Sequence, residues 1–147
     1  MNTGKYDVAV RPPRLTDASG PNRNLRRSWS VITTFLAAVI FAEAVFAGAM
    51  LSGYGWARTA HLANAGLLIA STIAAGLVAV VTLRRIPHGP RLGLILLLLA
   101  AVVFLQTAIG KSAANGTNLM WVHVPLGVAL VGFAAQAVAG ARRLGEE

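Results

Sequence analysis

The sequence contains no cysteine and little charge: only 12% of its 147 residues are Asp, Glu, Lys or Arg, against roughly 25% in a typical soluble domain. The absence of cysteine excludes a disulfide scaffold and any group attached through thiols. The low charge, together with a hydrophobic fraction of 56%, excludes a water-soluble globule and a fully disordered chain. The net charge of +8 indicates nucleic-acid binding only if the basic residues gather on one recognition surface.

Polar residues are concentrated at the two ends of the chain. The first thirty residues contain Pro12, Pro13 and Pro21 and show neither a helical nor a strand period. We therefore expect residues 1–30 to form a disordered, basic cytoplasmic arm. Residues 142–147 are expected to form a short cytoplasmic tail.

Four long apolar stretches lie between these ends, at about residues 31–51, 57–83, 92–110 and 120–141. A hydrocarbon core about 30 Å thick requires about 20 helical residues. A helix satisfies its own backbone hydrogen bonds inside the bilayer, where no water is present. The pattern predicts an all-α integral membrane protein. Because the connections are short, its four transmembrane helices should form an up-down-up-down bundle.

The distribution of Lys and Arg predicts the orientation of this bundle. Every basic residue except Arg58 and Lys111 lies in the arm, in the loop at residues 84–91 or in the tail. An excess of basic residues marks the cytoplasmic side, so we expect a multi-pass protein of the inner (plasma) membrane with both termini in the cytoplasm. The charge then sets topology and contacts the lipid bilayer, and no nucleic-acid partner is expected.

The first and third apolar stretches share a phrase, LAAVIFAE at residues 36–43 and LAAVVFLQ at residues 99–106. The alignment places Glu43 opposite Gln106. A histidine follows each at nearly the same spacing, His61 after Glu43 and His123 after Gln106. This pattern predicts a 2+2 internal repeat, in which two helical hairpins are related by a rough two-fold axis along the membrane normal.

His61 and His123 are the candidate metal ligands. Both lie near the beginning of their helices, and in a four-helix bundle these two helices are diagonal, roughly 14 Å apart. That separation suits a planar metal cofactor held between two imidazoles, and haem b is the natural candidate. Small residues one turn further along, including Gly127, would leave room for a flat ring. Small residues are equally typical of close helix packing without any ligand.

Glu43 and Gln106 are the other candidate cofactor-binding residues. An ionisable group inside a membrane segment is costly and is by default a functional candidate. Glu43 would hydrogen-bond a ligand, a histidine or a proton path, or would join helices as a neutral carboxyl paired with Gln106 or Asn64. Gln106 alone is typical of a helix–helix hydrogen bond. His88, in the basic loop IPHGP, is interpreted as a solvated loop residue.

The run FLQTAIGKSAANGTNLMWVHVPLGVAL resembles part of the heme A synthase family. It has a Gln four residues before a Gly on one helix, then a loop and a His that begins the next helix. That family has two four-helix halves, each offering a histidine pair to haem, and this chain resembles one half. The resemblance implies that His61 and His123 ligate haem b. The pattern is also similar to small four-helix bacterial membrane proteins.

The chain departs from the family pattern in two ways. The segment SGYGWART before His61 contains no acidic residue, and the outer-loop cysteine pair is missing. We therefore expect a haem b protein for electron transfer or haem handling near the outer face, working with a membrane redox complex. Heme A synthase-like oxidoreductase activity would require a homodimer with a catalytic Glu43. The alternative is a cofactor-free membrane protein that scaffolds or regulates a larger complex.

Overall fold

The computed structural model describes residues 20–145, and in this range the chain forms four helices. They are α1 (Gly20–Leu51), α2 (Ala57–Thr82), α3 (Gly89–Ala114) and α4 (Met120–Arg142). Each is long and apolar enough to cross a membrane. The predicted all-α fold with four candidate transmembrane helices is thereby confirmed.

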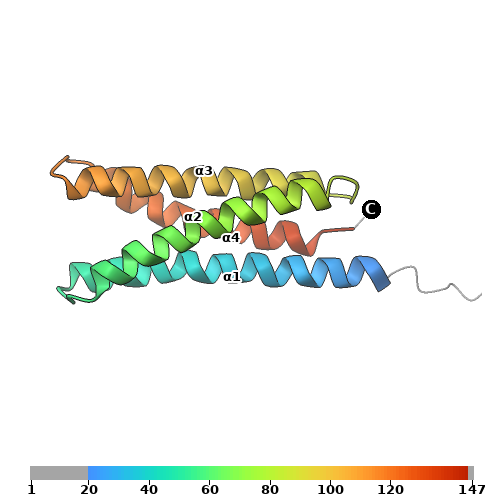
Figure 1. The fold of residues 1–147 in the computed structure, drawn as a ribbon, viewed down its shortest axis with the longest axis horizontal. Helices are drawn as coiled ribbons and strands as arrows, with labels where there is room; N and C mark the ends of the chain where they lie inside the picture. The colour runs from blue at the N-terminus through green and yellow to red at the C-terminus, as the bar shows by residue number, and fades with distance from the viewer. Residues whose placement is uncertain (1–19, 146–147) are drawn as a thin grey trace, which may run out of the picture.

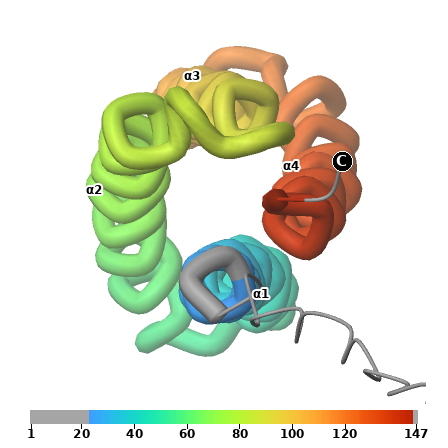
Figure 2. Tube along the Cα trace, turned by 90° about the vertical axis from the view of Figure 1, so that its right-hand side faces the viewer, coloured from blue at the N-terminus to red at the C-terminus, as the bar shows by residue number. Residues whose placement is uncertain are grey.

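The four helices are arranged in a ring, as the end-on view shows (Figure 2). α1 and α3 each pack closely against both α2 and α4, whereas the backbones of the diagonal pairs α1–α3 and α2–α4 do not approach closely among the described residues. Consecutive helices run in opposite directions (Figure 1). We call the end that holds the beginning of α1, the α2–α3 turn and the end of α4 the arginine-rich end. The end that holds the α1–α2 and α3–α4 connections is called the loop end.

α1 begins well before the start expected from the sequence. Its first residue is Gly20, so the prediction of a disordered arm over residues 1–30 is wrong for residues 20–30, and residues 1–19 lie outside the described part of the chain. Pro21 is in the first turn, where a missing N–H costs nothing. Trp29 is only 4% exposed and packs in the same core cluster as Leu36, so tertiary burial holds this basic segment as helix.

α3 is also longer than expected, because the glycine and proline before it begin the helix instead of preceding it. Pro90 occupies the first turn, where proline is favoured. His88 adopts a left-handed conformation with φ of 61°, which reverses the chain after α2. A Cβ on Gly89 would overlap the carbonyl oxygen of Leu83, so only glycine fits there. α4 extends to Arg142, and Glu146 and Glu147 of the expected tail lie outside the described residues.

α2 and α3 pack closely through a reciprocal pair of glycines. A Cβ on Gly76 would lie 2.8 Å from Leu97 Cδ2, and a Cβ on Gly93 would lie 2.9 Å from Val80 Cγ2. Each helix therefore presents a glycine and a large side chain four residues apart, and each glycine receives the large side chain of its partner. Close approach over small residues is the usual means by which helices associate in a membrane, where the hydrophobic effect does not drive them together.

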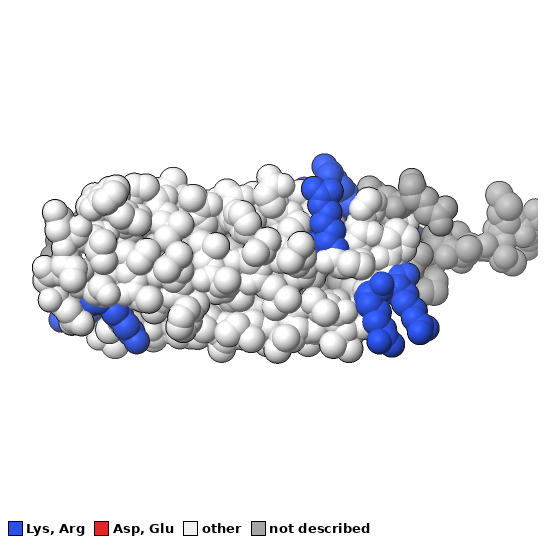
Figure 3. Space-filling model, turned by 90° about the horizontal axis from the view of Figure 1, so that it is seen from above, with Lys and Arg blue, Asp and Glu red and all other residues white. Residues whose placement is uncertain are grey.

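The packed core occupies only part of the length of the bundle. Its buried residues fall at residues 29–40 of α1, 68–79 of α2, 89–103 of α3 and 130–141 of α4. Toward the loop end, Ala57 is the only buried residue within residues 41–67, and none is buried within residues 104–129. The core thus closes the arginine-rich end, while the helices near the loop end enclose half-buried side chains. On the face in Figure 3, Lys and Arg lie toward the two ends and leave the middle uncharged.

Candidate functional site

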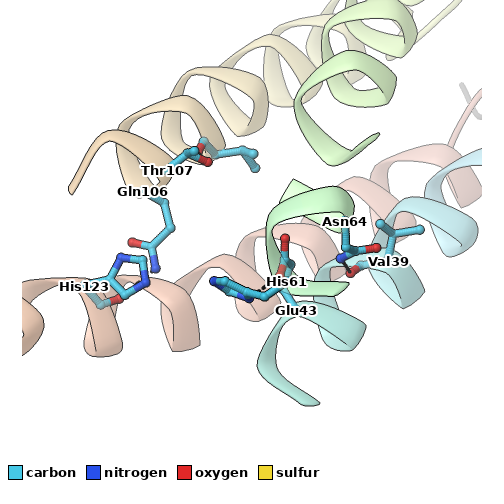
Figure 4. A network of polar contacts seen from close by, with 8 residues as sticks. Val39, Glu43, His61, Asn64, Gln106, Thr107 and His123 are labelled. Atoms are coloured by element: carbon cyan, nitrogen blue, oxygen red, sulfur yellow. Dashed lines mark hydrogen bonds and ion pairs between the residues drawn. The ribbon is translucent and has the colours of Figure 1, made fainter. Parts of the chain in front are cut away.

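Five polar side chains lie near the loop end of the bundle, beyond the packed core. We call this group the polar cluster; its members are Glu43 of α1, His61 and Asn64 of α2, Gln106 of α3 and His123 of α4 (Figure 4). Every helix contributes at least one member. The candidate residues Glu43, His61, Gln106 and His123, distant in sequence, therefore lie in one layer of the fold.

The carboxylate of Glu43 pairs with the imidazole of His61. Glu43 Oε2 lies 2.5 Å from His61 Nδ1, and the two side chains are 16% and 21% exposed. The alternative pairing of Glu43 with Asn64 or Gln106 is wrong, because Asn64 Nδ2 donates to the carbonyl oxygen of Val39 at 3.1 Å and Gln106 is engaged elsewhere. The contact uses Nδ1 of His61, and no described residue pairs with Nε2. A carboxylate on one ring nitrogen orients the other toward a metal or a proton partner.

The side chain of Gln106 contacts the backbone of His123. Gln106 Nε2 donates to the carbonyl oxygen of His123 at 2.8 Å. The same amide covers Gly127, where an added Cβ would lie 3.0 Å from Gln106 Nε2. The expectation that Gly127 leaves room for a flat ring is therefore wrong. Gly127 instead allows Gln106 to approach α4 closely enough to reach the His123 carbonyl.

The imidazole of His123 packs against Gly110, a residue that the candidate site predicted from sequence did not include. A Cβ on Gly110 would lie 2.7 Å from His123 Cε1 and 3.2 Å from Nδ1. Nδ1 of His123 is buried and has no hydrogen-bond partner among the described residues. The Gln-x-x-x-Gly spacing was the available signal for this contact, because residues four apart lie on one face of a helix.

The α1–α2 pair and the α3–α4 pair make different contacts at the positions that the sequence alignment matches. In the first, the acidic side chain of α1 contacts the imidazole of α2. Between α3 and α4, the amide of Gln106 contacts the backbone of His123, and the imidazole of His123 packs against Gly110.

This donor set limits the metal chemistry that the polar cluster supports. Within residues 20–145 no three His, Cys, Asp or Glu side chains come together in a group that would hold a metal ion. A tetrahedral zinc site needs at least three protein ligands. A haem iron needs only axial ligands from the protein, and imidazole is a common one. Among the described residues, the imidazoles of His61 and His123 are the side chains of the polar cluster with this donor chemistry.

Comparison with known proteins adds no further constraint. No protein-family model, curated protein or solved structure matches this chain. The four apolar helices define the class as a multi-pass membrane protein, and the function must be argued from the polar cluster.

Proposed function

We propose that the chain is a b-type haem protein of the plasma membrane, which transfers electrons or handles haem near the loop end. The observation that carries the proposal is a layer of unsatisfied polar atoms around two imidazoles. Glu43 Oε1, Gln106 Oε1 and His123 Nδ1 are buried without hydrogen-bond partners in the described chain. Buried polar groups are almost always paired, so three unpaired atoms in one layer favour a polar ligand at this place.

His61 would hold the haem iron, because its contact with Glu43 fixes the orientation of its ring. The carboxylate engages Nδ1 at 2.5 Å and thereby selects Nε2 as the nitrogen that faces a ligand. Metal-bound histidines usually pair their second nitrogen with a carboxylate or carbonyl in this way. In this proposal Glu43 is a positioning residue, because it acts on the cofactor through His61.

His123, on the diagonal helix α4, would be the second residue to hold the haem iron. The backbones of α2 and α4 do not approach closely within the described residues, which leaves the two imidazoles on separate, diagonal helices. Gly110 and Gln106 act as positioning residues for His123. Gly110 packs against its imidazole ring, and Gln106 donates a hydrogen bond to its backbone carbonyl. When bound, a haem with two imidazole ligands supplies one-electron transfer.

The proposal includes the membrane orientation and the family resemblance that the sequence predicts. Both termini lie in the cytoplasm, because the arginine-rich end carries nearly all basic residues and such clusters remain inside. The helices then alternate up and down as a 2+2 repeat. The chain would be a half-size relative of the heme A synthase family that binds haem b, with a redox complex or a second copy as its partner.

Haem loading of the purified protein tests the proposal. The protein is produced with added haem, purified in mild detergent and assayed for haem per chain and for its absorbance spectrum. We expect about one haem per chain with a Soret band, and loss or broadening of the band in His61→Ala and His123→Ala. His88→Ala, which removes a histidine at the opposite end, is the matched control and should keep the band. A protein that stays colourless with intact helical content would overturn the proposal.

A second candidate function is a cofactor-free scaffold or regulator of a membrane complex. It is favoured by the ability of the Glu43–His61 contact and the Gln106–His123 hydrogen bond to join neighbouring helices without a ligand. Interhelical polar contacts commonly have this role in membranes. Under this alternative both histidine variants keep the activity of the complex and the protein co-purifies with a partner.

A further inference from the structure

A groove lies on the surface of the packed core at the arginine-rich end, away from the polar cluster. It is formed where the beginning of α3 meets the end of α4. Its rim carries the exposed basic side chains His88, Arg91 and Arg143, and its floor includes the apolar Leu92 and Ile95. Gln136 of α4 also lines the groove, so an amide lies beside the apolar floor.

The basic rim has no anionic partner among the described residues. Glu43 is the only carboxylate side chain in residues 20–145 and lies in the polar cluster near the loop end. Arg91 and Arg143 form no ion pair or side-chain hydrogen bond with any described residue. Arginine binds phosphate oxygens with two parallel N–H donors. Two such side chains and an imidazole on one rim therefore match a phosphate group in charge and in hydrogen-bond chemistry.

The apolar floor of the groove favours a phospholipid over a free phosphate ion as its ligand. Ile95 and Gln136 lie four and seven residues inward from Arg91 and Arg143, which is about 6 Å and 10 Å along the helix axes. The groove therefore passes from charged groups at its rim to apolar groups toward the middle of the bundle. A phospholipid presents the same order, with a phosphate, then polar glycerol ester oxygens, then acyl chains. Basic pockets between helices near a membrane surface bind acidic headgroups in this way.

We propose that this groove is a specific site for an anionic glycerophospholipid of the phosphatidylglycerol type. The phosphate binds Arg91 and Arg143 with His88 beside it, the amide of Gln136 hydrogen-bonds the glycerol or ester oxygens, and an acyl chain lies over Leu92 and Ile95. The inference does not depend on haem binding, because the groove and the polar cluster lie at different ends of the bundle.

Lipid retention in native mass spectrometry tests this site. The full chain is purified in mild detergent, mixed with phosphatidylglycerol or phosphatidylcholine, and the fraction of lipid-bound protein is measured. We expect phosphatidylglycerol to be retained and phosphatidylcholine to be lost. In Arg91→Gln/Arg143→Gln the apparent affinity for phosphatidylglycerol should fall at least about tenfold. Arg84→Gln/Arg85→Gln removes the same charge from the adjacent turn without altering the groove lining and should retain the lipid.

Two further measurements distinguish a lipid site from a general attraction of anions to the arginine-rich end. Ala139→Phe fills the groove without changing charge and should abolish retention, and circular dichroism checks that each variant keeps its helical content. Inorganic phosphate at millimolar concentration should leave lipid retention unchanged. The proposal is overturned if Arg84→Gln/Arg85→Gln loses the lipid as fully as Arg91→Gln/Arg143→Gln, if phosphatidylcholine is retained equally, or if inorganic phosphate displaces the lipid.

Discussion

Oε2 of Glu43 lies 2.5 Å from Nδ1 of His61, and this contact joins α1 to α2 beyond the end of the packed core. It is the only contact between a carboxyl group and an imidazole within residues 20–145. A carboxylate inside a membrane-spanning helix is costly unless it is paired. The pairing therefore explains how α1 tolerates Glu43, and it determines which nitrogen of His61 is available to a ligand.

Replacement of Glu43 by Gln tests whether the carboxylate positions His61. The variant keeps the size of the side chain but replaces the carboxyl group with an amide, which is a weaker hydrogen-bond acceptor than a carboxylate, so the imidazole is held less firmly. We expect haem affinity to fall about 10-fold to 100-fold, the usual effect of losing the partner of a metal-bound histidine. Haem titration followed by absorbance measures the change.

Thr107→Val is the matched control for this substitution. Thr107 lies beside Gln106 on α3, and its hydroxyl donates to the carbonyl of Val103 in its own helix at 2.9 Å. It does not contact His61, so its haem affinity should match that of the native chain. Equal affinities for Glu43→Gln and the native protein would show that the carboxylate does not position a ligand.

Replacement of Gly110 by Ala tests how the ring of His123 is positioned. The new Cβ would lie 2.7 Å from Cε1 of His123, which forces the ring or α4 to move. We expect a loss of about 1–3 kcal/mol in stability together with weaker haem binding, measured by thermal unfolding in detergent. Gly66→Ala is the control, because nothing lies within 4 Å of its Cβ. That variant should gain about 0.5–1 kcal/mol from helix propensity, and a similar gain in Gly110→Ala would argue against the ring contact.

Replacement of Gly89 by Ala tests the α2–α3 turn. The added Cβ would overlap the carbonyl oxygen of Leu83, and backbone cannot move aside as a side chain can. We expect a loss of at least about 1–3 kcal/mol in thermal unfolding. Gly48→Ala, where the Cβ meets nothing within 4 Å, should leave the transition unchanged or raise it. A native transition temperature in Gly89→Ala would contradict the turn geometry.

The absence of cysteine allows the membrane topology to be tested with single introduced thiols. Thr117→Cys places a thiol in the exposed α3–α4 connection, and Pro87→Cys places one in the exposed α2–α3 turn. In intact cells, a maleimide that does not cross membranes should label only Thr117→Cys. Pro87→Cys should react only after permeabilisation, because the basic residues keep this turn inside. The reverse labelling pattern would invert the proposed orientation.

The sequence predicted the helices well because each span must satisfy its own backbone hydrogen bonds in the bilayer. It did not predict that α1 begins at Gly20, because a Gly-Pro pair followed by arginines looks the same in a loop and in the first turn of a helix. The deciding factor is the burial of Trp29 against other helices, which no local pattern contains.

The composition of the polar cluster was predictable, but its pairing was not. The alignment of the two similar phrases predicted that Glu43 and Gln106, and likewise His61 and His123, lie at matching depths. Which side chains touch depends on the rotation of each helix about its axis, and a nearly uniform apolar sequence gives little information on that rotation. The sequence offered a histidine as one of several partners for Glu43, and the structure selects His61. The covering of Gly127 by Gln106 and the role of Gly110 became apparent only in the structure.

Electron paramagnetic resonance of the ferric, haem-loaded protein tests the central claim most directly, since the spin state of the iron reports its axial ligands. If His61 and His123 both bind the iron, the native chain and His88→Ala give a low-spin signal typical of two imidazoles. His61→Ala and His123→Ala then each give a high-spin signal or no bound haem. A high-spin native spectrum, or a low-spin spectrum that neither substitution changes, would contradict the assignment.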